Sequence, residues 1–313
     1  FQLSYQQMPL FGMTVPYFGL NDSNINDFLR KKYTYLRLMN VFYYVTTNQY
    51  DDKATNYTTP VFSQQKKSTE DGTIYKINNP NSFISSFSHV FLFIGKDTLH
   101  DFNALKVKSL VLSKNFDIQK YVIFSTDEDI SKLDLSQFSG FIIDDVVSVP
   151  DKIKHTNYIT LHFSYNHYDY VSQRSNSVFV DNPAVYLAKN EQKKFDTFLQ
   201  KADLPSNILS QEKNNPTIKL LTFTPEKLIF SVTTANQTAI TIADTYFPNW
   251  YATIDKNSTS VFMSDGLLKG MFVPKGMHIV TLEFKPVFFY IGALITIISV
   301  VTIGIFLYKM YKK

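Results

Sequence analysis

The stretch MFVPKGMHIVTLEFKPVFFYIGALITIISVVTIGIFLY, Met271–Tyr308, combines three structural signals in one continuous segment. Its middle part alternates apolar and polar residues as a half-buried β-strand does, with Val280, Leu282 and Phe284 on one face. Pro274–Gly276 precedes that pattern, and because proline fixes φ and glycine accepts a positive φ, we expect a turn there. The remainder is an uninterrupted apolar run. The segment therefore predicts two short strands that lead directly into a membrane-spanning helix.

The apolar run has the length and composition of a transmembrane helix. Val287–Tyr308 contains no charged residue, and about 20 residues suffice to cross the hydrocarbon core of a bilayer. Lysines follow within 309–313, and because positive residues beside a span are retained in the cytoplasm, we expect a cytoplasmic tail there. We therefore predict a span at 286–308 in the cell membrane, with the residues before it outside the cytoplasm. The alternative is a buried helix of a soluble protein.

Upstream of the span, the pattern of short strands predicts two folded units. His89–Ile94 is a short apolar run closed by glycine, which is typical of a buried parallel strand, and a helix-like segment follows at Leu99–Leu112. We assign 88–176 to a small α/β unit with three layers. Short strands separated by turns after Pro216 predict an antiparallel β-sandwich, which we assign to 177–285. The expected fold class is mixed α+β, with one C-terminal transmembrane helix.

The first part of the chain, 1–87, gives weaker signals. Phe1–Leu20 is apolar and aromatic with glycine and proline breakers, so we expect an irregular segment that packs on the ectodomain or on the membrane. Strands are expected at Val41–Thr46 and Ile74–Ile77. The polar stretch Asn48–Asp71 between them predicts a surface loop.

Composition excludes several classes of protein. With 44% hydrophobic and 16% aromatic residues, the chain can fill a packed core. The net charge of +4 is not gathered into arginine clusters, so we expect no nucleic-acid partner. The absence of cysteine rules out disulfides and thiolate metal sites. No signal peptide follows Phe1, so we expect a mature chain or a piece of a longer protein.

Triplets of the form Asn-x-Ser/Thr permit glycosylation outside the cytoplasm, although a chain rich in these residue types also contains them by chance. They occur at Asn21, Asn56, Asn236 and Asn257.

The single tryptophan lies in an aromatic cluster shortly before the span, in ADTYFPNWYATID, Ala243–Asp255. Two interpretations stay open. Aromatic residues most often fill a core, and a turn would then bring Trp250 and Tyr246 into the sandwich. Alternatively these two rings stack on a sugar while Asp244 or Asn249 hydrogen-bonds its hydroxyl groups. These four residues form the candidate carbohydrate-binding site.

The stretch HFSYNHYDY, 162–170, is a weak candidate for a metal site. His162, His167 and Asp169 carry groups that can bind zinc, yet their spacing matches no metal motif. We therefore expect ordinary surface residues and no metal.

Acidic residues follow two of the expected strands. Asp144 and Asp145 end a strand at the edge where α/β proteins often hold their sites and could serve as acid–base groups, but we expect solvated strand ends there. The cluster Asp127–Asp129 is typical of a helix N-cap. The chain has no G-x-G-x-x-G, P-loop or G-x-S-x-G motif, so we expect neither a nucleotide cofactor nor a serine hydrolase.

Several stretches match one family signature in the same order. TAITIADTYFPNWYATID, 238–255, is similar to a strand followed by a YYPGW-type motif, and GLLKGMFVPKGMHIVTLEFKPVFFYIGALIT, 266–296, is similar to a basic-Gly, Pro-x-Gly-x-His stretch before a last span. YLRLMNVFYYVTT, 35–47, and IYKINNPNSF, 74–83, match shorter pieces. The chain thus resembles the C-terminal region of YfhO-like membrane proteins, in the GT-C class of polytopic glycosyltransferases. It departs at Asn249, where that family has glycine.

The resemblance implies an extracytoplasmic region that assists transfer of a sugar from a lipid-linked donor to an envelope glycan or protein acceptor. Catalytic carboxylates of that class lie in early loops between N-terminal spans, so we assign no catalytic residue to this chain. The implied partners are the bilayer, the lipid-linked sugar or glycan acceptor, and an upstream transmembrane module of the same protein. The alternative is a non-catalytic single-span envelope protein with a binding or structural role.

Overall fold

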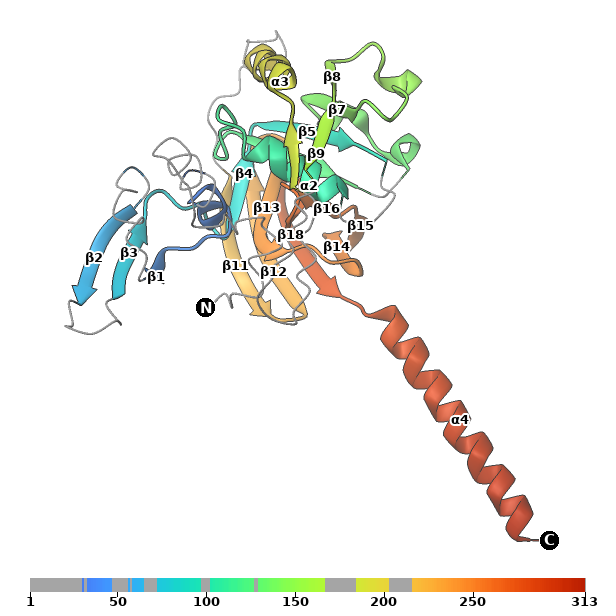
Figure 1. Ribbon diagram of the computed structural model, residues 1–313. Helices are drawn as coiled ribbons and strands as arrows, with labels where there is room; N and C mark the ends of the chain where they lie inside the picture. Colours follow the sequence, from blue (N-terminus) through green and yellow to red (C-terminus); the bar gives the residue numbers. More distant parts are fainter. Residues whose placement is uncertain are drawn as a thin grey trace, which may run out of the picture.

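The computed structural model describes residues 30, 33–46, 56, 58–64, 72–96, 102–126, 129–166, 184–202 and 216–312. Within these ranges the chain forms a mixed α+β fold with several sheets and a long C-terminal helix, which confirms the expected fold class. Figure 1 shows the main body of the fold, with the sheet of β1, β2 and β3 to its left and the last helix, α4, protruding from it. The expected irregular segment at 1–20 lies outside the described residues.

The largest sheet has eight strands and contains segments from both expected units. Its order is β4-β13-β17-β16-β6-β5-β7-β8. The strands are β4 (Ile84–Phe87), β13 (Thr238–Thr245), β17 (Leu268–Val273), β16 (Phe262–Ser264), β6 (Tyr121–Ser125), β5 (His89–Ile94), β7 (Gly140–Asp144) and β8 (Tyr158–Leu161). The β6-β5-β7-β8 half is parallel and the other half is antiparallel. The ranges 88–176 and 177–285 therefore share one sheet.

The two halves of this sheet meet where β16 pairs with β6. The regular ladder joins Met263–Ser264 to Phe124–Ser125. Asp265 extends it, because its backbone N–H donates to the carbonyl of Ile123 at 2.8 Å and its carboxyl group accepts from the Ile123 N–H at 3.0 Å. Asp265 is buried, and this burial raises its pKa to about 7, while the hydrogen bonds from Ile123 and Ser264 act in the opposite direction.

A second, antiparallel sheet of five strands completes the expected β-sandwich. Its order is β11-β12-β18-β14-β15. The strands are β11 (Thr217–Thr224), β12 (Lys227–Thr234), β18 (Gly276–Phe284), β14 (Trp250–Ile254) and β15 (Asn257–Thr259). Its Phe230 and Val280 share a core with Ile240 and Met271 of the larger sheet, and all four are fully buried. Each such side chain contributes about 1.5–3 kcal/mol of burial free energy.

The turn at Pro274–Gly276 carries the chain from one sheet to the other. The strand before it, β17, belongs to the eight-stranded sheet, and the strand after it, β18, lies in the middle of the five-stranded sheet. Gly276 has a φ of 126°, which confirms the expected positive φ. The turn is thus a sandwich corner between sheets.

The parallel half of the large sheet is covered on both faces and forms three layers. Helices α2 (Phe102–Val111) and α3 (Lys189–Ala202) cover one face, where Val107 and Phe195 pack into the same core as Phe91 of β5. The expected helix at Leu99–Leu112 is thereby confirmed as α2. Short 3₁₀ segments cover the other face. They are η3 (Ile130–Lys132), η4 (Leu135–Gln137) and η5 (Asp151–Ile153).

An aromatic cluster on that second face limits the size of the residue that β17 can carry beside it. Phe124 stacks on Phe262 with ring centroids 5.1 Å apart and meets Phe272 edge-on at 5.4 Å. A Cβ atom at Gly270 would lie 2.4 Å from the Phe124 ring, so the close approach of β17 to this cluster requires glycine.

Two smaller sheets lie outside this framework. One contains β1 (Tyr43–Thr46), β3 (Gly72–Ile77) and β2 (Thr58–Gln64), and the other pairs β9 (Phe163–Asn166) with β10 (Ala184–Leu187). The strands expected at Val41–Thr46 and Ile74–Ile77 are confirmed as β1 and β3. The surface loop expected at Asn48–Asp71 is wrong for 58–64, which form β2 and pair with β3. The threonine, valine and phenylalanine of TTPVFSQ favour a strand, but the polar residues around them obscured that preference.

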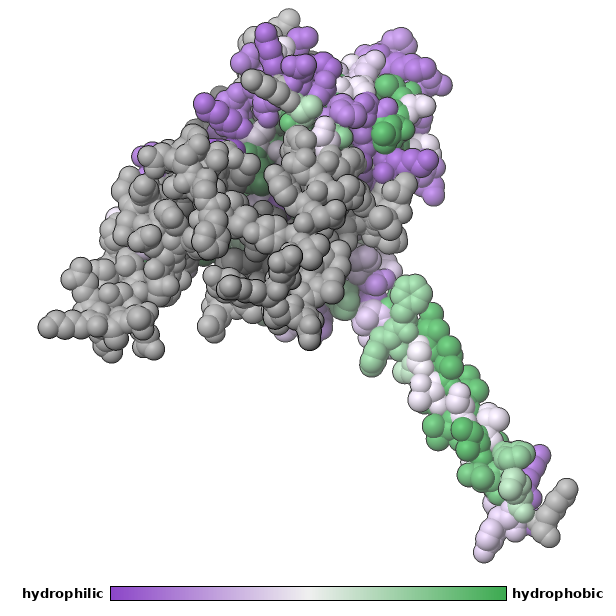
Figure 2. Space-filling view, viewed as in Figure 1, coloured by the Kyte–Doolittle hydropathy of each residue, from purple (hydrophilic) through white to green (hydrophobic). Residues whose placement is uncertain are grey.

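Helix α4 (Val287–Tyr311) leaves the body at the end of β18 after only Lys285 and Pro286. Its 25 residues extend about 37 Å, which exceeds the hydrocarbon thickness of a bilayer of about 30 Å. None of its described residues is buried, and Figure 2 shows apolar side chains along its length. Among the described helices it is long and apolar enough to cross a membrane. A buried core helix, the alternative reading of this run, does not fit this exposed position, whereas a membrane anchor does.

We expect Asp265→Asn to flatten the pH dependence of stability between about pH 4 and pH 7. A carboxyl group with a folded-state pKa of about 7 and an ordinary value of 3.8 holds a proton in the folded chain and not in the unfolded chain, so the free energy of unfolding falls as pH rises through this interval. Asparagine tolerates the local φ of 54° and keeps the acceptor for Ile123. Urea unfolding of the detergent-solubilised chain across this interval measures the slope.

The exposed Asp151 offers the matched control. Its pKa is lowered, chiefly by the hydrogen bond from Lys154, so its titration lies below the interval and Asp151→Asn should leave the slope unchanged. An Asp265→Asn chain as pH-dependent as the unaltered protein contradicts the assignment.

Candidate functional site

Trp250 begins β14 at the end of the five-stranded sheet nearest α4. It pairs with Phe284, the last residue of β18, and their ring centroids lie 5.7 Å apart at 47°. The indole is partly buried and packs against the sandwich core. The Nζ atom of Lys269 lies 3.8 Å from the indole centroid, within cation–π range. The tryptophan therefore closes the end of the sandwich next to α4.

Lys269 is a buried cation between the two sheets. Its side chain projects from β17, is almost fully buried, and its Nζ atom lies 2.5 Å from Oδ2 of Asp244 on β13. Burial lowers the pKa of Lys269, and the hydrogen bond and charge of Asp244 oppose that shift. Asp244 is partly exposed, so the ion pair runs from the interior to the surface. Lys269 thus links Asp244 to Trp250.

The loop between Asp244 and Trp250 is held by its backbone. The N–H of Tyr246 donates to the carbonyl of Leu267 at 2.7 Å, and the carbonyl of Asn249 accepts from the N–H of Lys285 at 2.9 Å. Asn249 has a φ of 76°, a conformation that glycine and asparagine adopt most easily. The departure from glycine at Asn249 is therefore compatible with the turn.

All four residues expected to bind carbohydrate gather at one edge of the sandwich. Asp244 and Trp250 meet through Lys269, whereas Tyr246 and Asn249 shape the loop between them. Their binding of a sugar stays a prediction. Sequence reasoning gave no role to Lys269, although a lysine in the apolar run GLLKGMFV signals a buried charge that needs a partner.

A second ion pair joins the two stretches that carry the family resemblance. Oδ2 of Asp255 lies 2.6 Å from Nδ1 of His278, and Oδ1 of the same carboxylate accepts from the N–H of Ile279 at 2.9 Å. The hydrogen bond with His278 lowers the pKa of Asp255, and that same bond raises the pKa of His278. Asp255 and Lys256 both have positive φ, as a tight type I′ hairpin turn requires. This pair fastens β14 to the start of β18.

The carboxyl ends of the parallel strands carry two further pairs. Asp144 is buried and bonded to the ammonium of Lys106 on α2. The expectation of solvated strand ends is therefore wrong for Asp144, because α2 brings a cation over the strand end. Asp145 is exposed, and its Oδ2 atom lies 2.7 Å from Nδ1 of His162. Asp129 caps η3 by accepting from the N–H of Ser131, which confirms the expected N-cap; the other members of its cluster lie outside the described residues.

The remaining expected residues are those of the metal site and the glycosylation triplets. His167 and Asp169 lie outside the described residues, and no three His, Asp or Glu side chains in the described part come close enough to hold a metal ion. Three of the glycosylation triplets begin at exposed asparagines, and Asn21 lies outside the described residues. The exposed ones are Asn56, Asn236 and Asn257.

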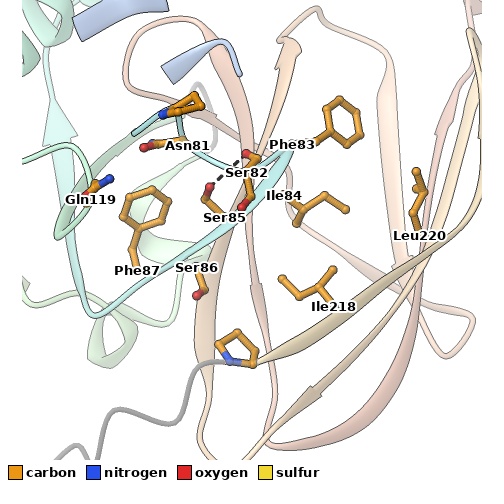
Figure 3. Close-up of a pocket in the computed structure, with 12 residues that line it drawn as sticks. Asn81, Ser82, Phe83, Ile84, Ser85, Ser86, Phe87, Gln119, Ile218 and Leu220 are labelled. Carbon is orange, nitrogen blue, oxygen red and sulfur yellow. Dashed lines mark hydrogen bonds between the residues drawn. The ribbon is translucent and has the colours of Figure 1, made fainter. Parts of the chain in front are cut away.

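A groove of about 670 Å³ opens along one side of the sandwich, between the edge strands β4 and β11 (Figure 3). Its walls combine amide and hydroxyl groups with apolar side chains. The lining includes Asn81, Ser82, Ser85, Phe83, Gln119 and Ile218. The described lining residues carry no charge, so they offer no group for acid–base chemistry.

No family model, no curated protein and no solved structure matches this chain. The resemblance to YfhO-like membrane proteins therefore rests on the quoted stretches alone.

We expect Asp244→Asn to lower the free energy of unfolding by about 1–3 kcal/mol, because a buried ammonium then loses its carboxylate partner. Lys269→Met is the matched comparison: it removes the buried charge together with its need for a partner, so it should cost less. Denaturant unfolding monitored by the fluorescence of Trp250, which contacts Lys269, measures both variants. A larger loss in Lys269→Met than in Asp244→Asn would show that the ion pair itself, rather than an uncompensated charge, sets the stability here.

Proposed function

We propose that the chain is a membrane-anchored ectodomain that works outside the cytoplasm and directly beside the bilayer, with a binding or structural role. The observation that carries this proposal is the junction of β18 and α4. A strand in the middle of a sheet leads through two residues into a helix long enough to span a membrane. The folded body cannot move far from the lipid surface with so short a linker, because two residues extend at most about 7 Å.

Charge supports the proposed orientation. Lys309 and Lys312 follow the apolar run at its far end, and lysines flanking a span are retained in the cytoplasm. The sheets at the other end of α4 would then lie outside the cytoplasm.

We expect single-cysteine variants to report this orientation, since the native chain contains no cysteine. In intact cells, a membrane-impermeant maleimide should label Val146→Cys, whose position is exposed in the body, and should not label Lys312→Cys. Permeabilised cells should label both. Labelling of Lys312→Cys alone in intact cells contradicts the orientation, and recovery of the chain from the aqueous fraction contradicts the anchor.

A second candidate function follows from the place of the aromatic site. We infer that the ectodomain assists sugar transfer from a lipid-linked donor, as the resemblance to YfhO-like proteins implies. What favours this role is that Trp250 and Asn249 lie at the edge next to α4, where the head of a lipid-linked sugar would be within reach. The two resembling stretches also form neighbouring strands, β14 and β18. The protein need not supply catalytic groups for this role.

We expect Asn249→Gly to weaken binding of a lipid-linked sugar at least about threefold, since it removes the side-chain amide, and one neutral hydrogen bond is worth about 1 kcal/mol. Glycine keeps the φ of 76°, so the turn should survive. Binding of a polyprenyl-phosphate hexose to the full chain in nanodiscs provides the measurement. Asn79→Gly is the matched control, because Asn79 also has a positive φ, is exposed and lies in another part of the fold. Equal binding by the two variants excludes Asn249 from sugar contact.

A further inference from the structure

Two large aromatic side chains are exposed beside the linker to α4. Phe247 lies in the loop that ends at Trp250, and Tyr251 follows Trp250 in β14; they are 59% and 48% exposed. We call these two residues the aromatic rim. Neither has a role in the sandwich core, whose cluster contains Trp250 instead. Single exposed rings are common on protein surfaces, and what distinguishes these two is their position beside the linker to α4.

The rim is held in place relative to the start of α4. Tyr251 pairs with Glu283 in the ladder of β14 and β18, and the Nζ atom of Lys285 lies 5.8 Å from the Tyr251 ring centroid. The N–H of Lys285 donates to the carbonyl of Asn249 at 2.9 Å, which ties the loop to the linker. A bilayer that contains α4 therefore meets this loop at a fixed height.

The linker is itself ordered. The N–H of Val287 donates to the carbonyl of Lys285 at 2.8 Å, and the N–H of Phe289 donates to the carbonyl of Pro286 at 3.0 Å. These bonds begin the first helical turn at once, so no flexible segment separates the sheet from the helix. The orientation of the body relative to the helix axis is restrained by them.

The apolar surface of α4 begins at its first residue. Phe288, Phe289 and Tyr290 are 79%, 70% and 62% exposed, so the first turn already offers rings to lipid. Tyrosine and tryptophan are enriched at the level of the lipid headgroups, where one end of the ring is apolar and the other is hydrated. Lys285, which contacts Asn249 and Tyr251, is two residues before Val287, so the rim lies close to the start of α4.

We propose that the aromatic rim inserts into the headgroup–acyl boundary of the bilayer that α4 crosses, and so fixes the ectodomain against the membrane surface. Phe247 supplies an apolar tip, Tyr251 an amphipathic ring, and Lys285 a cation near the lipid phosphates. The partner is the phospholipid surface itself. This proposal rests on the membrane anchoring proposed above, because without α4 in the bilayer the rim has no fixed height.

The absence of cysteine allows a depth measurement in the full chain. A nitroxide label is attached to one of three variants reconstituted in phosphatidylcholine vesicles: Phe247→Cys, Val146→Cys or Ile298→Cys. Val146 is the water control, since it is 64% exposed after β7, which Figure 1 places on the side of the body away from α4. Ile298 lies within α4 and controls for insertion of the helix. Collision rates with oxygen, which concentrates in lipid, and with a water-soluble nickel chelate give the depth of each label.

We expect the oxygen-to-nickel ratio at position 247 to exceed that at position 146 by at least about threefold, as burial in the interface requires, and to lie below that at position 298. A ratio at 247 equal to that at 146, with 298 lipid-exposed, overturns the rim and leaves the anchor standing. A water-exposed label at 298 overturns the anchor and the rim together. Because all three positions are exposed, labelling them should not unfold the chain, and circular dichroism of each labelled variant verifies this.

Discussion

The fold depends on a single short junction, the pairing of β16 with β6, which makes one sheet out of two structural types. The ladder between these strands is brief, and the buried carboxyl group of Asp265 supplies the bond to Ile123 that a longer β16 would have made with its backbone. Burying a carboxyl group raises its pKa and is unfavourable at neutral pH. The junction persists because both faces of the sheet continue across it: the aromatic cluster around Phe124 lies on one face, and helix α2 and the sandwich core share the other. The parallel half and the sandwich therefore have one orientation relative to each other.

The end of the sandwich next to α4 also depends on a buried ionisable group. A sandwich needs closure at its ends, and this end is closed by Trp250 over the ammonium of Lys269 rather than by aliphatic side chains. A lysine there costs stability by desolvation, which Asp244 offsets by pairing at the surface. The loop from Asp244 to Trp250 is consequently fixed at both ends, and the ring of Phe247 within it is exposed. Of the aromatic residues in this stretch, Trp250 packs against the core and Phe247 and Tyr251 are exposed, while sugar contact stays a prediction.

Local patterns predicted most elements of this fold but not how they join. The apolar run of α4, the buried strand His89–Ile94 and the sandwich strands follow from periodicity, which is a property of neighbouring residues. The pairing of β16 with β6 joins residues far apart in the sequence, and nothing in either short strand specifies it. The pair of Lys106 and Asp144 is also distant in the sequence. Asp144 was expected to face solvent, but α2 places the Lys106 ammonium over it. The candidate residues Asp244 and Trp250 were chosen because they lie in one aromatic stretch. The lysine that connects them belongs to a different strand and became evident only from the packing.

The connection between β18 and α4 turns this arrangement into a constraint on function. A flexible linker would let the body rotate freely, and any site on it would sample all distances from the lipid. Here the strand, the hydrogen-bonded linker and the first helical turn follow one another without an unordered residue. The end of the sandwich that carries Trp250 lies beside the start of the helix, while the groove between β4 and β11 opens along a side of the sandwich. With α4 in a bilayer, as proposed, a ligand of the Trp250 end would lie close to the membrane surface, whereas a ligand of the groove would have no such restriction.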